Sequence, residues 1–258
     1  MTAAKVFFQN SKDQKICGIL EKSNKNSSRV VILIHGYSSN KNRPSSLDLA
    51  TELSKRGINS LRIDLNGCGE SEGEFKFQTI TSTVDDVEAA MNYLKSLGYS
   101  QMELFGASAG GLTAMATALK HPEVARLGLK CPVSDYVDQK IKRKGKGGIQ
   151  EWKDEGFSIY TSSSSGREHQ VDYSVFEDYK NYIMFDKVKD IKCPTLIVHG
   201  DADDVVDVED SKRLVKNFPN AELMIMPGAN HTFDKNEDRV WMNRMFGEWF
   251  EAAFSQSL

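Results

Sequence analysis

The sequence has few of the features that mark secreted, membrane or nucleic-acid-binding proteins. Only four of its 258 residues are cysteine, without a C-x-x-C pair or a histidine at zinc-ligand spacing, so free thiols are predicted rather than disulfides or a metal site. No uncharged apolar run approaches the roughly 20 residues of a membrane helix, and the N-terminus lacks the apolar segment of a signal peptide. A net charge of -3 gives no field that favours nucleic acid. We therefore expect a soluble, cytoplasmic protein without an integral membrane segment or a nucleic-acid partner; the sequence does not specify its oligomeric state.

Most of the chain alternates between strand and helix patterns. A hydrophobic content of 40% is enough for a sizeable core. Residues 4–9 and 14–20 are predicted to form an antiparallel hairpin, and the β-branched run at 29–34 a strand buried on both faces. Further strands are predicted at 59–63, 102–105, 126–130, 194–199 and 222–226, and helices at 47–56, 79–97, 209–217 and 238–254. This alternation predicts an α/β fold with a mainly parallel sheet and helices on both faces.

The alternation fails between Cys131 and Cys193. We interpret residues 132–192 as a lid inserted into a core made of residues 1–131 and 193–258. Within the lid, residues 157–161 and 170–173 are predicted to form a hairpin over the site. A basic run also lies there, and its glycines favour a mobile, solvated loop over an anion-binding patch. The basic run consists of Lys140, Lys142, Arg143, Lys144 and Lys146.

The stretch from Gln101 to Leu119 indicates a nucleophile. A short apolar strand leads into Gly106-Ala107-Ser108-Ala109-Gly110, and an Ala/Leu-rich helix follows without a linker. On so sharp a turn only small neighbours fit, and Ser108 is expected to adopt a strained conformation with its hydroxyl clear of the sheet. The alternative is an ordinary glycine-rich helix start, since short patterns of small residues also occur by chance.

A serine nucleophile needs a neutral imidazole as base and an acid that orients it. His231 is the predicted base because it lies in a loop directly after the last strand. The predicted acid is Asp203, in the loop after the strand at 194–199, with Asp201 as second choice. The other four histidines are His35, His121, His169 and His199. The first and last of these follow strands and are expected to hydrogen-bond the next loop, whereas capping or solvent exposure explains the other two.

The glycine-rich loop at residues 64–73 also invites a dinucleotide interpretation. Its glycines at positions 67, 69 and 73 give G-x-G-x-x-x-G, and residues 74–78 do not open an obvious helix. A phosphate cradle is therefore disfavoured, and a tight loop at the end of a strand is predicted.

Together these motifs resemble the α/β-hydrolase superfamily, in its chain order of Ser, acid and His. The motifs are His35-Gly36, the DLNGCGESEG loop, the G-x-S-x-G turn, HGDADDVV and GANHTF. Within the superfamily the chain looks most similar to bacterial cinnamoyl and feruloyl esterases, and to enzymes labelled serine aminopeptidases or monoglyceride lipases. The resemblance implies a catalytic triad of Ser108, Asp203 and His231. It also implies an oxyanion hole formed by the backbone amides of Tyr37 and Ala109, and no metal or organic cofactor.

The sequence supports a serine carboxylesterase acting on small or aromatic esters. An acyl thioesterase or a peptidase on the same triad remains an alternative, because the acyl-enzyme chemistry is shared. A non-catalytic ligand-binding protein on this fold is an alternative of another class. With an unperturbed His231, activity is expected to fall below pH ~6.5, where the imidazole becomes protonated.

Overall fold

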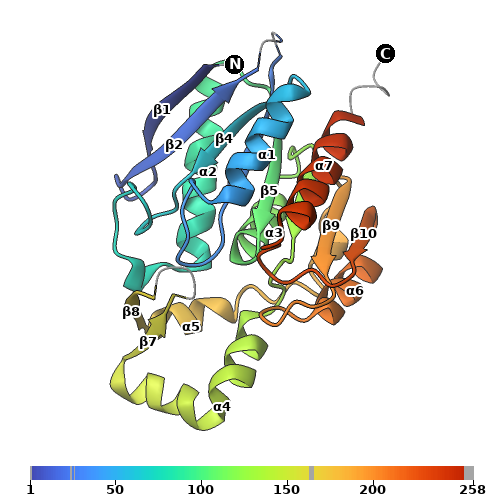
Figure 1. The fold of residues 1–258 in the computed structure, drawn as a ribbon. Coiled ribbons are helices and arrows are strands. Elements are labelled where there is room, and N and C mark those ends of the chain that lie inside the picture. The colour runs from blue at the N-terminus through green and yellow to red at the C-terminus, as the bar shows by residue number, and fades with distance from the viewer. Residues whose placement is uncertain (1, 24, 26, 163–165, 253–258) are drawn as a thin grey trace.

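The computed structural model describes residues 2–23, 25, 27–162 and 166–252. An eight-stranded sheet of order β1-β2-β4-β3-β5-β6-β9-β10 forms its centre (Figure 1). The strands are β1 (Thr2–Gln9), β2 (Lys15–Lys22), β3 (Arg29–Ile34), β4 (Asn59–Ile63), β5 (Gln101–Ala107), β6 (Leu127–Lys130), β9 (Thr195–Gly200) and β10 (Ala221–Met226). The β1–β2 and β2–β4 pairs are antiparallel, and the other five pairs are parallel. The predicted mainly parallel sheet and the N-terminal hairpin are confirmed.

Helices cover both faces of this sheet, as predicted (Figure 1). One face is covered by α1 (Pro44–Lys55) and α7 (Asn236–Ala252), which contact each other. The other is covered by α2 (Ile80–Ser96), α3 (Ala109–Lys120) and α6 (Val208–Asn217). The last two residues of the helix predicted at 238–254 lie outside the described residues. Within the described ranges, no helix combines the length and the apolar character that crossing a bilayer requires.

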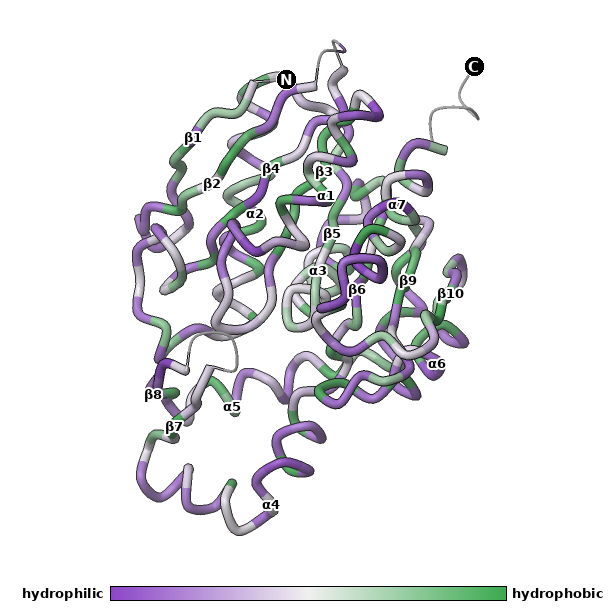
Figure 2. The backbone as a smooth tube through the Cα atoms, viewed as in Figure 1, coloured by the Kyte–Doolittle hydropathy of each residue, from purple (hydrophilic) through white to green (hydrophobic). Residues whose placement is uncertain are grey.

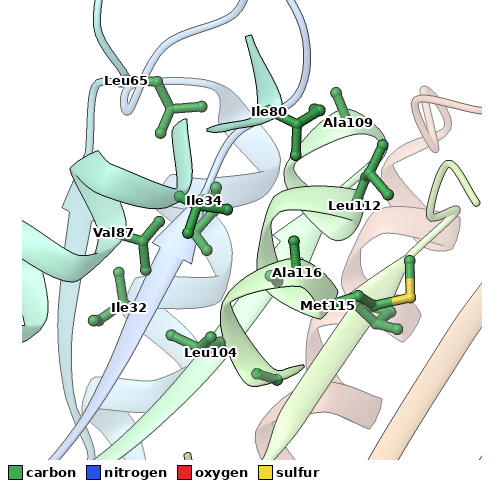
Figure 3. Close-up of a cluster of buried hydrophobic side chains, with 14 of the residues drawn as sticks. Ile32, Ile34, Leu65, Ile80, Val87, Leu104, Ala109, Leu112, Met115 and Ala116 are labelled. Atoms are coloured by element: carbon green, nitrogen blue, oxygen red, sulfur yellow. The ribbon is translucent and has the colours of Figure 1, made fainter. Parts of the chain in front are cut away.

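The strand β3 shows why the central strands have no polar alternation. All six of its residues are buried, because helices lie on both sides. Val31 and Leu33 pack with the α1 and α7 side chains, whereas Ile32 and Ile34 face the opposite layer. Figure 3 shows the second layer, where Ile32 and Ile34 of β3 lie near Val87 of α2 among other apolar side chains. The central strands are accordingly among the most hydrophobic parts of the chain (Figure 2).

An insertion separates β6 from β9 and lies beyond one end of the sheet (Figure 1). It contains α4 (Tyr136–Glu155), β7 (Phe157–Thr161), β8 (Glu168–Asp172), α5 (Tyr173–Tyr179) and the short η2 (Val188–Asp190); a further short helix, η1 (Phe75–Phe77), follows β4. The strands β7 and β8 pair antiparallel, which confirms the hairpin expected in this region. The division into a core and a lid of residues 132–192 stays a prediction.

The basic run is not a solvated loop, as the sequence suggested, but part of α4. Asp135 caps this helix by accepting a hydrogen bond from the backbone of Asp138, and lysine and arginine are good helix formers. The glycines that suggested a loop lie near its middle, where Gly145 has φ 71° and kinks the helix. Tyr136 and Lys140, one turn apart, are buried against the rest of the protein. The helical period therefore separates the run into a buried face and an exposed face.

Candidate active site

Ser108 occupies the sharp turn between β5 and α3. Its φ of 56° and ψ of -117° are strained for a residue with a side chain, as the sequence predicts. The two flanking glycines are required by contacts with backbone. A Cβ at Gly106 would lie 2.2 Å from the carbonyl oxygen of Gly110, and a Cβ at Gly110 would lie 2.4 Å from that of Ile34. Only glycine fits at either position, and this close packing fixes the Ser108 side chain at the carboxyl end of the sheet.

The structure brings Ser108, His231 and Asp203 together from three distant loops. His231 Nε2 lies 3.0 Å from Ser108 Oγ, and His231 Nδ1 lies 2.7 Å from Asp203 Oδ2. Because a carboxylate can only accept, Nδ1 carries the proton and Nε2 is free to accept from the serine hydroxyl. The second-choice acid, Asp201, instead accepts a hydrogen bond from the backbone of Gly228. Of the two candidate acids, Asp203 is the one that contacts the imidazole.

The side chain of Asp203 is fully buried and is held from several sides. Its Oδ1 accepts hydrogen bonds from the backbone N–H groups of Val205 and Val206, at 2.8 and 2.9 Å. Its Oδ2 also lies 3.1 Å from His199 Nε2. Burial alone would raise the pKa of Asp203, but the hydrogen bonds from His199 and His231 outweigh it and hold the pKa well below its usual range. The carboxylate therefore stays ionised and fixed in orientation.

The electrostatics of His231 follow from these neighbours. Burial opposes the protonated ring, but Asp203 and the nearby thiol of Cys131 raise the pKa of His231 above its ordinary value. His199 and Cys131 are the two site neighbours that sequence reasoning missed. His199 contacts the loop after its strand through Val206, as expected, and also Asp203. The sequence feature that could have indicated the contact of His199 is its four-residue spacing to Asp203. For Cys131 the only such feature is its position directly after a strand.

The loop after β3 runs beside Ser108. A Cβ at Gly36 would lie 3.3 Å from Ser108 Cβ and 3.8 Å from Ser108 Oγ. His35 fixes this loop, since its Nδ1 donates to the Gly36 carbonyl at 2.7 Å and its Nε2 accepts from the backbone of Leu65 at 3.1 Å. Burial lowers the pKa of His35, which favours this neutral ring. Among the described residues, the backbone N–H groups of Tyr37 and Ala109 donate no hydrogen bond, so both are available to a ligand.

A cavity of about 230 Å³ opens in front of Ser108 and His231. The insertion supplies part of its wall, through α4 and β7. Three tyrosines line it, namely Tyr37, Tyr136 and Tyr160, and so do five basic residues, namely Arg43, Lys130, Lys140, Arg143 and Arg239. With Asp234 as the one acidic residue among its described lining residues, the cavity is thus aromatic and rich in positive charge, a feature that the overall net charge of -3 conceals.

Two clusters of potential metal ligands occur in the described part of the chain. One is Cys131, His199 and Asp203, and the other is Cys17, Asp64 and Glu70. In the first, His199 uses its two ring nitrogens for Ser211 and Val206. In the second, Asp64 already binds the Lys41 ammonium at 2.5 Å and the backbone of Glu70 at 2.8 Å. In each cluster, one potential ligand is therefore already engaged in contacts within the protein.

The sequence profile of the prolyl oligopeptidase family matches residues 45–257, most of the chain. The chain belongs to the prolyl oligopeptidase family. This membership shows that the protein is an α/β-hydrolase and an enzyme of the serine hydrolase class. The non-catalytic alternative is accordingly disfavoured.

One relative of this prolyl oligopeptidase family member is the bovine palmitoyl-protein thioesterase ABHD10, mitochondrial. The two are 24% identical over 225 residues, a match that covers 81% of this chain and 68% of that protein. The mouse serine hydrolase BPHL is 28% identical over 156 residues, and the match spans about half of each protein, 57% of this chain and 54% of BPHL. Among solved structures, Est1E from Butyrivibrio proteoclasticus superposes with a TM-score of 0.81 at 21% identity, over 98% of this chain and 99% of that one. Est1E has also been solved with ferulic acid bound. These likenesses confirm the predicted fold.

Proposed function

We propose that this hydrolase is a carboxylesterase that cleaves small or aromatic esters through an acyl-enzyme intermediate. The observation that carries the proposal is the pair of contacts from His231, at 3.0 Å to the Ser108 hydroxyl and at 2.7 Å to the Asp203 carboxylate. A serine activated by a neutral, oriented imidazole is the arrangement that acyl transfer requires.

In the proposed mechanism, His231 Nε2 takes the proton as Ser108 Oγ attacks the ester carbonyl. The buried Asp203 carboxylate stabilises the resulting imidazolium. The backbone N–H groups of Tyr37 and Ala109 receive the negative charge that develops on the carbonyl oxygen, a contribution worth about 3–4 kcal/mol for each donor. His231 then protonates the leaving alcohol, and water releases the acyl group by the same steps in reverse order.

The cavity supports small or aromatic esters. Its tyrosine wall suits a planar ring, and the ferulic acid bound to Est1E contains a ring of that kind. Long acyl chains fit this cavity poorly, because charged side chains line it and burying methylenes beside them brings little gain.

A thioesterase is the second candidate, favoured by the name of the ABHD10 relatives. Peptidase activity on the same triad is the remaining alternative. A panel of 4-nitrophenyl esters, acyl-CoA thioesters and aminoacyl amides ranks the three activities by kcat/KM. The carboxylesterase proposal expects the short and aromatic esters to rank first.

The decisive experiment compares wild type and Ser108→Ala on 4-nitrophenyl acetate and butyrate. Loss of the nucleophile is expected to lower the rate on the order of a millionfold, which reaches the uncatalysed background. Ser96→Ala, which changes an exposed serine at the end of α2, is the matched control. A fluorophosphonate probe should label a peptide containing Ser108 in wild type. Equal rates for wild type and Ser108→Ala would refute the proposal.

A further inference from the structure

Lys140 is a buried cation in the wall of the active-site cavity. It lies on α4 with only 9% of its surface exposed, and it lines the same cavity as Ser108. Its Nζ lies among three rings, 4.9 Å from the centre of Tyr136, 5.3 Å from that of Tyr37 and 5.8 Å from that of Tyr160. In the part of the chain that the structure describes, no carboxylate or other acceptor is paired with this ammonium. The ring faces offset only part of the cost of removing it from water.

The charge of Lys140 is also uncompensated by its wider surroundings. The charged groups that act on it are Arg143 and Lys144, which are both cations. Lys130 provides a comparison: it is equally buried in the cavity wall, but it lies near Asp203 and Asp234. Burial and the two neighbouring cations lower the pKa of Lys140 to about 8, which is still above neutral pH and favours the charged form at pH 7. The insertion therefore brings positive charge to the cavity without a counterion.

Arg143 lies three residues after Lys140 on α4 and lines the same cavity. Lys144, in contrast, is engaged away from it, with its ammonium 2.6 Å from Ser158 Oγ. An ammonium and a guanidinium on adjacent turns form a pair of donors suited to one carboxylate. A bound monoanion would supply the single negative charge that the buried ammonium of Lys140 lacks as a counterion.

We infer that Lys140, together with Arg143, binds a carboxylate on the substrate, so that the preferred esters carry a negative charge away from the scissile bond. The inference rests on the proposed esterase function, because the same cavity holds Ser108. It names a substrate class that the triad chemistry alone does not select, and it gives the insertion a role in specificity.

The test uses two matched pairs of substrates. On the acyl side, 4-nitrophenyl 4-carboxybenzoate is compared with 4-nitrophenyl 4-carbamoylbenzoate. On the alcohol side, 4-acetoxybenzoate is compared with 4-acetoxybenzamide. Wild type is expected to prefer the carboxylate member of at least one pair by about 10- to 100-fold in kcat/KM, the range of a charge-assisted hydrogen bond. The two pairs also show on which side of the ester the anion binds.

Three variants separate the charge of Lys140 from its packing. Lys140→Met removes the charge at similar length and should bring the ratio within the preferred pair close to one, whereas Lys140→Arg should keep the preference. The matched control is Lys142→Met, because Lys142 is exposed on the same helix and pairs with Asp138. Each ratio is measured within one enzyme preparation, so partial misfolding cancels.

A measurement without any variant gives the same information. Benzoate should inhibit wild-type hydrolysis of the neutral esters competitively, and benzamide should inhibit at least tenfold more weakly.

If wild type hydrolyses the neutral esters but prefers neither carboxylate, or if Lys140→Met keeps the wild-type ratio, the anionic substrate class is refuted and the esterase proposal stands. If wild type hydrolyses none of the esters, the esterase proposal itself fails.

Discussion

Replacing Gly36 by alanine is expected to slow the enzyme without unfolding it. The added Cβ would lie 3.2 Å from the carbonyl oxygen of Ala107 and 3.3 Å from Ser108 Cβ, contacts that are tight but not overlapping. The backbone of Gly36 does not have a positive φ, so alanine can adopt it. The loop must therefore shift by a few tenths of an ångström. This shift moves the next residue, Tyr37, whose N–H is a proposed oxyanion donor.

The size of the effect follows from what that donor contributes. Complete loss of one oxyanion donor costs about 10²- to 10³-fold in kcat, and a lengthened hydrogen bond should cost about tenfold, or about 1.4 kcal/mol. The loss should fall on kcat rather than on KM, because the oxyanion exists only in the transition state. Steady-state kinetics with 4-nitrophenyl acetate measure the loss in kcat, and a thermal unfolding curve measures whether the variant stays folded.

Gly147→Ala is the matched control for this substitution. Its Cβ would meet nothing within 4 Å, and alanine favours the helix that Gly147 occupies. Its activity should equal that of wild type. An unchanged kcat in Gly36→Ala would refute the placement of the oxyanion donor, and a loss of activity that merely follows a loss of thermal stability would refute the reasoning from local geometry.

Three further predictions concern the same site. The acid limb of the kcat/KM profile should have an apparent pKa above the ordinary 6.5 of histidine. Because the pKa of His231 is raised, this base becomes protonated, and so inactive, at a higher pH than an ordinary histidine. An acid limb at or below 6.5 would contradict this. Asp203→Asn should lower kcat by about 10⁴-fold and move that limb to lower pH, whereas Asp201→Asn, whose carboxylate does not contact His231, should leave both unchanged. Gly110→Ala should destabilise the fold by about 1–3 kcal/mol or more in urea unfolding, since its Cβ would lie 2.4 and 2.5 Å from the carbonyl oxygens of Ile34 and His35; a stability within error of wild type would count against the tight turn.

Local patterns predicted the parts of the molecule that depend on neighbouring residues in the chain. The turn around Ser108 could be predicted because the apolar strand, the small residues and the helix that form it follow one another directly in the chain. His231 was chosen because its loop directly follows the last strand, and Asp203 because its loop follows the strand at 194–199; the structure brings these side chains together.

The parts that the sequence did not predict depend on contacts across the fold. Cys131 lies beside His199 and Asp203 because β6 and β9 are neighbours in the sheet, and no local pattern encodes that adjacency. The burial of Lys140 was missed for a related reason. Its charge and the nearby glycines suggested solvent, but its position one helical turn after Tyr136 places it against Tyr37 and Tyr160.

The place where the insertion joins the sheet has a consequence for engineering. It leaves the sheet after β6 and returns before β9, and these two strands pair in parallel from Leu127 opposite Thr195 to Lys130 opposite Val198. Because the two strands are adjacent and parallel, the chain leaves at the carboxyl end of β6 and re-enters at the amino end of β9, so a foreign segment grafted there must be long enough to cross back along the sheet. Ser108, Asp203 and His231 all lie outside the grafted segment. Chimaeras of this kind would exchange selectivity while inheriting an intact reaction centre.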